Sequence, residues 1–440
     1  MKGDDIERRA HRVLEVLRAH GLKLATAESC TGGMIAAALT EIAGSSDVVE
    51  RGFVTYSNEA KTEMIGVPAA IIAANGAVSE PVARAMAEGA IQNSRAEVAV
   101  SVTGVAGPGG GTATKPVGLV HIACARRGVD TLHQEHRFRG DRAAVRAASV
   151  VAALDMVLRQ AARGRRRIDL PGRTSPTRAI GVDFSGAANA GRAIWIASGA
   201  IDGDMLRIES CIPAEALLDG ARGRDRALAA LVEFIAAQSD AIVGLDFPFG
   251  LPAKFVKAPD WVSFVRGFPK RFPSAEKLSA LGGSPRKEPK RLTDADAKTP
   301  FSAINRRVVH QTWAGISLVL RPLLERDAAR ILPMQAPREG APILVEICPA
   351  CTLKVEGLYM PYKGRGVAHK AWRRSILDTL VARGTLAPPP KDIETTAIGD
   401  VQGDALDAII AAVGAHRALY DKRLVDAPGP VAAIEGVVLY

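Results

Sequence analysis

Hydrophobic positions in the first third of the chain recur with the spacing of helices and of strands in turn. Residues 4–20 place Val13, Leu14 and Leu17 on one face and end before Gly21, which predicts an amphipathic helix. Apolar runs predict strands at 22–27, 48–56, 98–103, 118–125 and 131–138, and helical patterns occur at 34–42, from 57 onward, at 79–93 and at 141–162. Strands that alternate with helices over this length predict an α/β layered domain over residues 1–162.

The pattern breaks at residues 163–177, where proline, glycine and charged residues occur without apolar periodicity. We interpret this segment as a linker with a solvated basic cluster, Arg163-Gly-Arg-Arg-Arg167, although such a cluster can also bind phosphates. A second α/β domain is predicted over residues 178–440, with strands at 178–183, 193–198, 241–246 and 343–347 and helices at 222–238 and 403–413.

Residues 253–307 differ in composition from the rest of this second domain. They carry thirteen Lys and Arg against five Asp and Glu, with many prolines and glycines, which predicts an irregular insertion or a lid that contacts phosphates. The whole chain has 440 residues and a formal net charge of +10. This length favours two domains, and this charge favours an acidic partner such as a nucleotide or a nucleic acid.

The expected compartment follows from the cysteines and from the apolar runs. Five scattered cysteines fit reduced thiols better than a disulfide framework. No apolar run approaches the roughly 20 residues of a membrane span, and no signal-peptide core follows Met1. We therefore expect a cytoplasmic protein without a membrane partner, and we expect it to form a homo-oligomer.

The stretch Thr26-Ala-Glu-Ser-Cys-Thr-Gly-Gly33 lies between a predicted strand and a predicted helix. A serine on such a turn can attack a carbonyl if a base reaches it, and the free N–H groups that begin the helix can bind an oxyanion. Ser29 is the candidate nucleophile and Cys30 its rival, because a thiol at a helix N-terminus can have a lowered pKa. The alternative is that Ser29 or Thr31 only caps the helix.

Lys61 and a glycine-rich loop supply what such a serine needs. A lysine can act as the base if burial lowers its pKa, although at this position it would more often be a surface helix residue. The loop at 103–112 offers backbone N–H groups for an anion. Arg142 and Arg146, in the first turns of the last predicted helix, can meet a phosphate or remain exposed helix charges.

Four motifs in this half resemble the CinA C-terminal family. They are Ala27-Glu-Ser-Cys-Thr-Gly-Gly33, Gly52-Phe-Val-Thr-Tyr-Ser-Asn-Glu-Ala-Lys61, Gly76-Ala-Val-Ser-Glu80 and Thr103-Gly-Val-Ala-Gly-Pro-Gly-Gly-Gly111 with Lys115-Pro-Val-Gly118. The resemblance covers residues 5–162 and implies a cofactor-free amidase that hydrolyses the carboxamide of nicotinamide mononucleotide, with Ser29 as nucleophile, Lys61 as base and Tyr56 as a polar site residue. The expected substrate-binding residues are Cys30, Thr31, Gly32, Gly33, Thr103, Gly104, Gly107 and Arg142.

Acidic residues in the second half stand at predicted strand ends and on the last predicted helix. They are Asp183, Asp246, Glu346, Asp404 and Asp407. Carboxylates that end buried strands are costly unless they meet a cation, so these residues form a candidate Mg²⁺ or Mn²⁺ site of the kind that cleaves phosphodiesters. The alternative is that the strand-end aspartates cap turns and that the helix pair binds the basic insertion.

These acidic motifs resemble the family called domain of unknown function 429, whose members are predicted ribonuclease H-like nucleases. The resemblance covers residues 178–425 and implies a ribonuclease H-like fold and a nucleic-acid substrate. A separate motif, Cys348-Pro-Ala-Cys351, lacks the second cysteine pair of a structural zinc site, so we interpret it as two small buried residues. The competing hypothesis for the whole chain is a nucleotide- or nucleic-acid-binding protein in which one or both domains lack turnover.

Overall fold

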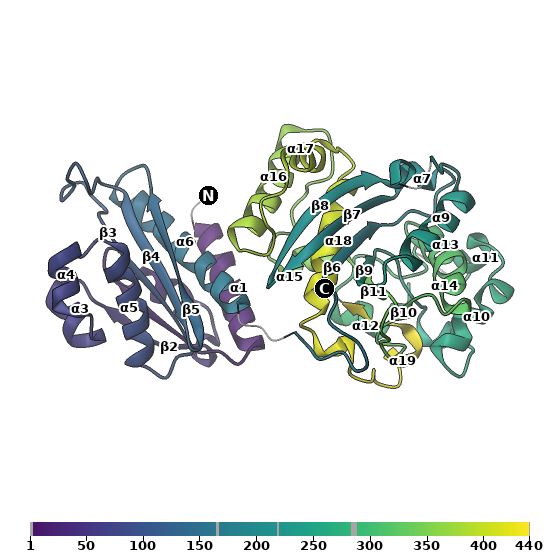
Figure 1. Cartoon of the computed structure of the whole chain (residues 1–440), viewed down its shortest axis with the longest axis horizontal. Helices are drawn as coiled ribbons and strands as arrows, with labels where there is room; N and C mark the ends of the chain where they lie inside the picture. The colour runs from purple at the N-terminus through teal and green to yellow at the C-terminus, as the bar shows by residue number, and fades with distance from the viewer. Residues whose placement is uncertain (1–2, 164–166, 218–219, 283–287, 440) are drawn as a thin grey trace. The chain divides into compact units, whose positions relative to one another are not determined.

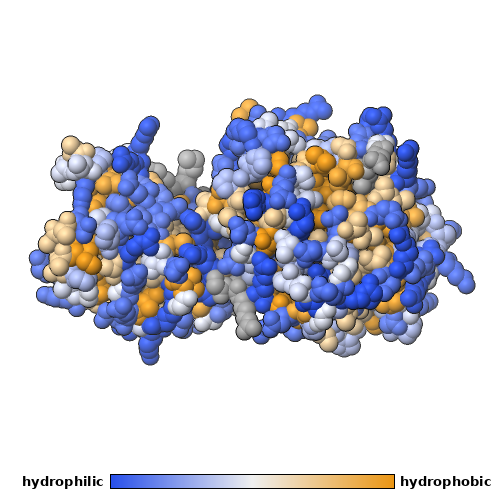
Figure 2. Space-filling view, in the orientation of Figure 1, coloured by the Kyte–Doolittle hydropathy of each residue, from blue (hydrophilic) through white to orange (hydrophobic). Residues whose placement is uncertain are grey.

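The computed structural model describes residues 3–163, 167–217, 220–282 and 288–439. The chain divides into two compact α/β units, residues 1–165 and residues 166–440 (Figure 1). On the face shown in Figure 2, hydrophilic residues cover much of both units, with hydrophobic residues showing between them. None of the helices in the described residues is long and apolar enough to cross a membrane.

The first unit is built around one five-stranded sheet. In chain order its elements are α1 Gly3–Ala19, β1 Leu24–Glu28, α2 Met34–Thr40, η1 Ser45–Asp47, β2 Val49–Val54, α3 Asn58–Ile65, α4 Ala69–Asn75, α5 Glu80–Gln92, β3 Val98–Gly104, β4 Leu119–Arg126, β5 Val129–Arg137 and α6 Arg142–Ala162. The strand order is β2-β1-β3-β4-β5, parallel from β2 to β3 and antiparallel from β3 to β5. The predicted elements are present in the predicted order, and α4 is an additional helix.

Helices cover both faces of this sheet (Figure 1). On one face α1, α2 and α6 enclose a core of branched aliphatic residues such as Leu17, Val100 and Leu154. On the other face α5, with α3 and α4, packs on smaller residues such as Ala25 and Ala99. Both faces of β1 and β3 are covered, so buried residues do not alternate with exposed ones along these strands, and even their polar residues are buried.

The second unit has a longer list of elements around a seven-stranded sheet. They are β6 Arg178–Asp183, α7 Ala190–Ala193, β7 Trp195–Asp202, β8 Met205–Pro213, α8 Ala214–Leu217, α9 Arg224–Ala236, β9 Ala241–Leu245, η2 Ala253–Phe255, α10 Trp261–Arg271, α11 Ala275–Ser279, α12 Leu292–Asp296, α13 Val309–Gly315, η3 Ile316–Leu320, α14 Arg321–Glu325, β10 Arg330–Ile331, β11 Ile343–Ile347, α15 Pro349–Val355, α16 Val367–Ala382, α17 Lys391–Gly399, α18 Asp404–Ala418, η4 Lys422–Leu424, α19 Ala432–Glu435 and β12 Val438–Leu439.

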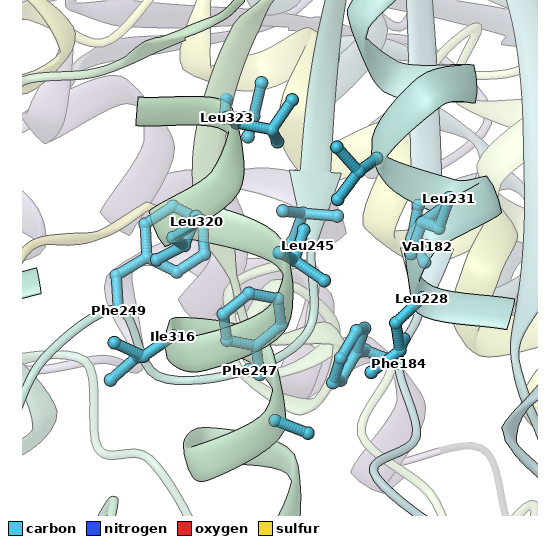
Figure 3. Close-up of a cluster of buried hydrophobic side chains, with 14 of the residues drawn as sticks. Val182, Phe184, Leu228, Leu231, Leu245, Phe247, Phe249, Ile316, Leu320 and Leu323 are labelled. Atoms are coloured by element: carbon cyan, nitrogen blue, oxygen red, sulfur yellow. The ribbon is translucent and has the colours of Figure 1, made fainter. Parts of the chain in front are cut away.

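The strand order in this sheet is β10-β11-β9-β6-β7-β8, with β12 also paired to β11. Strands β9, β6 and β11 are mutually parallel, so their carboxyl ends lie at one edge. The apolar helix α18 packs on one face, and α9 with η3 and α14 packs on the other. Figure 3 shows this second core, where Val182 and Leu245 from the strands meet Leu228, Leu231 and Leu320 from the helices.

Two segments differ from the expectations for loops. The insertion at 253–307 contains α10, α11 and α12, and its aromatic residues, such as Trp261 and Phe268, are buried in the second unit's core. The predicted linker 163–177 includes residues 164–166, which lie outside the described residues. From 167 onward it packs on the second unit, where Leu170 is buried and Arg173 donates a 2.6 Å hydrogen bond to the Ala341 carbonyl. This segment is held by the second unit more firmly than a solvated linker requires.

Candidate functional site

Ser29 and Lys61 lie together at the carboxyl end of the first sheet. Ser29 follows β1, and Lys61 is in the first turn of α3, which Ser57 caps by accepting a hydrogen bond from the Ala60 N–H. Lys61 Nζ lies 3.2 Å from Ser29 Oγ. The structure therefore brings together two side chains that are 32 residues apart in the sequence, at the distance that proton transfer requires.

The surroundings of Lys61 make its amine less basic than that of an exposed lysine. The side chain is 1% exposed, and burial lowers its pKa from the ordinary value of 10.5. The carbonyl oxygens of Thr55 and Ser57 lie 2.9 and 3.2 Å from Nζ. A neutral amine has two N–H groups for these acceptors and one lone pair, which can then face the Ser29 hydroxyl.

Glu28, the residue before Ser29, has a structural role that the sequence analysis missed. Its side chain is fully buried and accepts hydrogen bonds from the backbone N–H groups of Gly33, Ile35 and Ala36 at 2.9–3.0 Å. The prediction that the N-terminal N–H groups of this helix bind an oxyanion is therefore wrong for these three donors, because Glu28 already occupies them. The sequence contained a signal for this role, because an acidic residue ahead of a helix interacts favourably with the positive end of the helix dipole.

Arginines of α6 organise the loops around the serine. Arg146 donates hydrogen bonds to the carbonyl oxygens of Cys30 and Thr31 at 3.1 and 2.7 Å, so it fixes the turn instead of facing a phosphate. Arg142 is exposed and donates to the Gly107 carbonyl at 2.8 Å and to the Tyr56 hydroxyl at 3.2 Å. Arg142 thus gathers the glycine loop and Tyr56 at the rim of the site, with guanidinium surface left open to solvent.

The other predicted substrate-binding residues surround the serine in different ways. Burial raises the pKa of the Cys30 thiol to about 11, so a lowered pKa for this rival nucleophile is not what the structure supports. Thr31 is buried, and Thr103 donates a 2.8 Å hydrogen bond to the Ala77 carbonyl. Both threonines face the protein interior and shape the site.

Glycines are required where the backbone bends sharply around this site. Gly32 and Gly33 have φ angles of 59° and 94°, which L residues rarely adopt. In the glycine loop, a side chain at Gly104 would meet Val120 at 2.7 Å, and one at Gly107 would meet Val117 at 2.6 Å. The predicted loop glycines are therefore explained by close packing against β4 and the segment that precedes it.

In the second unit, Asp183 is the last residue of β6 and Asp246 directly follows the neighbouring parallel strand β9, at the ends that share one edge. The next residue after each aspartate is a phenylalanine, Phe184 or Phe247, whose ring is buried in the core shown in Figure 3. The two ring centres lie 4.5 Å apart. These rings anchor both strand ends, and the aspartates line a cavity of about 700 Å³.

Asp404 and Asp407, in the first turn of α18, line the same cavity. Lys363 also lines it, and its Nζ lies 2.5 Å from Asp407 Oδ2 and 4.0 Å from Asp404 Oδ1. The Tyr362 hydroxyl donates a hydrogen bond to Asp407 Oδ1 at 2.5 Å. The partner of the helix pair is therefore this Tyr-Lys loop and not the basic insertion, and neither Tyr362 nor Lys363 was predicted from the sequence.

Glu346, on β11, faces a different partner from the four aspartates. Its carboxylate accepts hydrogen bonds from the Arg291 guanidinium at 2.8 Å and from the Phe249 N–H at 2.9 Å. Arg291, which is buried, also binds Asp294 at 2.7 Å. Glu346 was predicted as a metal ligand, whereas the structure pairs it with an arginine. Arg291, from the basic insertion, is likewise committed to these carboxylates and not to a phosphate.

The four aspartates carry the electrostatic signature of a functional site. Burial and the nearby Asp407 carboxylate raise the pKa of Asp246 to about 8, and burial raises the pKa of Asp404 to about 6. Asp183 is 8% exposed and has no hydrogen-bond or ion-pair partner in the described part of the chain. An acid that is buried without a partner requires a cation or a proton.

The donor chemistry fits a hard divalent cation, because carboxylate oxygens are the ligands that Mg²⁺ and Mn²⁺ prefer. Among the residues that the structure describes, no three His, Cys, Asp or Glu side chains lie close enough to share one ion. Asp407 is engaged by Lys363 and Tyr362, whereas the side chains of Asp183 and Asp246 line the cavity without a hydrogen bond or ion pair to any described residue.

Cys348 and Cys351 stand where β11 meets α15, and Cys348 lines the cavity. The two sulfur atoms lie 2.8 Å apart, and Cys351 is fully buried. Both residues are free thiols, and the neighbouring thiol and burial raise the pKa of Cys348. We expected two small buried residues near a strand end. Cys351 is buried as expected, whereas Cys348 is partly exposed.

Comparison with known proteins separates the two halves of the chain. Residues 6–161 match the family described as CinA C-terminal domain, and residues 181–432 match the family described as protein of unknown function (DUF429). Over 160 residues, 36% of this chain, 48% of positions are identical to the nicotinamide-nucleotide amidohydrolase PncC of Escherichia coli K12, of which 97% is covered.

Other relatives of the first half include a longer protein. The chain is 51% identical over 145 residues to a CinA-like protein of Syntrophobacter fumaroxidans and spans 34% of its length. Among solved structures, the competence/damage inducible protein CihA of Agrobacterium tumefaciens is 54% identical, with 35% of this chain and 94% of that chain covered and a TM-score of 0.35. The chain thus spans about a third of the CinA-like protein and nearly all of PncC.

Proposed function

Since the chain belongs to the CinA C-terminal domain family through residues 6–161 and to the DUF429 family through residues 181–432, we propose that it joins a nicotinamide-nucleotide amidase to a cation-binding α/β domain. The observation that carries the first half of this proposal is the 3.2 Å contact between Ser29 Oγ and a buried Lys61 Nζ. PncC, the relative that the first unit covers almost completely, is named as a nicotinamide-nucleotide amidohydrolase.

The proposed chemistry proceeds through an acyl-enzyme. The neutral Lys61 amine removes the Ser29 hydroxyl proton as Oγ bonds to the carboxamide carbon of nicotinamide mononucleotide. Lys61, now protonated, returns the proton to the departing nitrogen, so that the C–N bond breaks and ammonia leaves. Water then attacks the ester, Lys61 again relays a proton, and nicotinic acid mononucleotide is released with Ser29 restored. The pyridinium ring withdraws electrons from the carbonyl and favours each attack.

Substrate binding is assigned to the rim of this site. Arg142 and Tyr56 are exposed and joined by a hydrogen bond, so a nucleotide phosphate can pair with the open side of the guanidinium. The donors of the oxyanion hole come from the turn ahead of Gly33 or from the 104–112 loop, since Glu28 occupies the N–H groups of Gly33, Ile35 and Ala36.

The test is to incubate the full chain with nicotinamide mononucleotide and to measure ammonia. Ser29→Ala should lower the rate by several orders of magnitude. Lys61→Arg should do the same, because arginine keeps the charge but cannot accept a proton at neutral pH. Cys30→Ala should retain most of the rate. Near-normal turnover of Ser29→Ala would refute the nucleophile, and tight nucleotide binding without ammonia release by the wild type would favour the binding-protein alternative.

For the second unit we propose a divalent-cation site of the ribonuclease H-like type that acts on nucleic acid. Its support is Asp183, which is buried, lines the cavity and has no partner among the described residues. Asp183 and Asp246 would hold Mg²⁺ or Mn²⁺, which would polarise a phosphodiester. Calorimetry with MnCl₂ should show binding that Asp183→Asn abolishes. Salt-dependent binding of DNA or RNA without cleavage would leave a binding module.

A further inference from the structure

Lys363 occupies an unusual position for a lysine on a loop. Its Nζ lies between the carboxylates of Asp404 and Asp407, at 4.0 and 2.5 Å, inside the cavity that all four aspartates line. Its side chain is about half exposed, so the charge stays accessible from the cavity. The lysine therefore places a positive charge where a second metal ion would otherwise neutralise the helix pair.

The loop that carries Lys363 is held by a buried arginine. Arg373, 2% exposed on α16, donates hydrogen bonds to the carbonyl oxygens of Tyr362 at 2.6 Å, Gly364 at 3.1 Å and Ile398 at 2.8 Å. Burying a guanidinium is costly, and here its donors bind the backbone on both sides of Lys363. Tyr362 adds a second constraint, because its buried hydroxyl binds Asp407. The position of Lys363 is thus fixed by the fold.

The four aspartates divide into two pairs on this basis. Asp404 and Asp407, from α18, face the Lys363 ammonium. Asp183 and Asp246, at the ends of β6 and β9, line the same cavity, and no positively charged side chain in the described residues forms an ion pair with either of them. The Lys363 ammonium therefore forms ion pairs with one pair of aspartates, and its charge acts on the other pair only without direct contact.

We propose that Lys363 fills one of the two cation positions of this carboxylate cavity, so that the cavity binds a single divalent ion, at Asp183 and Asp246. This inference rests on the proposed cation site of the second unit and specifies its stoichiometry. A second divalent ion beside the helix pair would lie within a few ångströms of the ammonium and would be repelled by it. The lysine keeps that position closed to metal.

The test counts bound ions and does not depend on activity. Full-length protein is titrated with MnCl₂, and bound Mn²⁺ is counted by calorimetry and by loss of the free-ion paramagnetic resonance signal. Lys363→Met removes the charge while keeping the length of the side chain, and Lys363→Arg keeps the charge. Lys391→Met, at an exposed lysine of α17, is the matched control. Thermal melting of each variant establishes that it is folded.

We expect one ion in the wild type, in Lys363→Arg and in Lys391→Met, and two ions in Lys363→Met. Asp183→Asn should lose the single wild-type ion. Two ions in the wild type, or one ion in both the wild type and Lys363→Met, would overturn the inference while leaving the cation site in place. No ion in any folded variant would remove the cation site and this inference together.

Discussion

The buried Glu28 carboxylate holds the start of α2, next to the candidate nucleophile Ser29. Substituting Glu28 and measuring the local stability of α2 tests this role. The carboxylate accepts three backbone hydrogen bonds, two at Oε2 from Gly33 and Ile35 and one at Oε1 from Ala36. Glu28→Gln keeps the shape of the side chain but offers one acceptor oxygen in place of two. Whichever way the amide is turned, at least one N–H group of the α2 start then faces an NH₂ group and loses its acceptor.

The expected cost follows from these contacts. A buried donor without an acceptor costs about 1–3 kcal/mol, and two bonds that change from a charged to a neutral acceptor lose about 1 kcal/mol each. Relief from burying a charge offsets part of this, so we expect a net loss of about 2–4 kcal/mol. If the α2 amides exchange through local opening of this helix, their protection against hydrogen exchange should therefore fall roughly 30- to 700-fold.

The assay is hydrogen exchange of the full chain, followed by mass spectrometry of peptides that cover residues 28–41. Glu41→Gln is the matched control, because Glu41 is exposed at the other end of α2 and such substitutions change stability by less than about 0.5 kcal/mol. Glu28→Gln should also slow ammonia release, since Ser29 is the next residue. Unchanged protection of the α2 peptides in Glu28→Gln would refute the structural role assigned to this carboxylate.

Three further predictions concern buried charges. Because burial lowers the Lys61 pKa, wild-type stability should rise as pH increases from that lowered value toward 10.5, and thermal melts of Lys61→Met should lack this rise. Because the pKa of Asp246 is raised to about 8, its contribution to stability should be lost as pH increases from 3.8 through 8. Asp246→Asn should therefore melt at a higher temperature than the wild type at pH 9 and at nearly the same temperature at pH 4. Melting temperatures equal to those of the wild type at both pH values would contradict this. Arg373→Leu leaves three buried carbonyl oxygens without a donor, so a loss of at least about 3 kcal/mol is expected in denaturant titration, with Arg374→Leu, at an exposed neighbour, as control.

Much of the fold is determined by local periodicity. The strands of the first sheet and the helices α1, α5 and α6 are long or strongly apolar, so their patterns predict them within about two residues. Two of the elements that were not predicted, α4 and β8, have weaker patterns. Helix α4 is a short alanine-rich segment, and β8 alternates buried and exposed residues over a single hairpin, as an edge strand does.

The residues of the candidate sites also differ in how far the sequence predicts them. Ser29 and Lys61 were predicted together because each stands in a distinctive motif, and the structure places them in contact. Lys363 was missed because nothing near it in sequence is acidic: its partner Asp407 lies 44 positions later on another element. Glu346 was assigned to the metal set because a strand-end acid looks the same in sequence whether its partner is an ion or a distant arginine.

Because Arg146 lies late in the first unit, the turn that carries Ser29 can be fixed in place only late in the synthesis of this unit. The turn that Arg146 clamps is made 115 residues earlier, so at about 5–20 residues per second the turn waits roughly 6 to 23 seconds for its arginine. By the later part of that interval Ser29 and Lys61 have both left the peptidyl-transferase centre, but the carbonyl oxygens of Cys30 and Thr31 still have no guanidinium to hold them. A nascent chain truncated before α6 would therefore carry both reactive side chains on a turn that is still free to change shape.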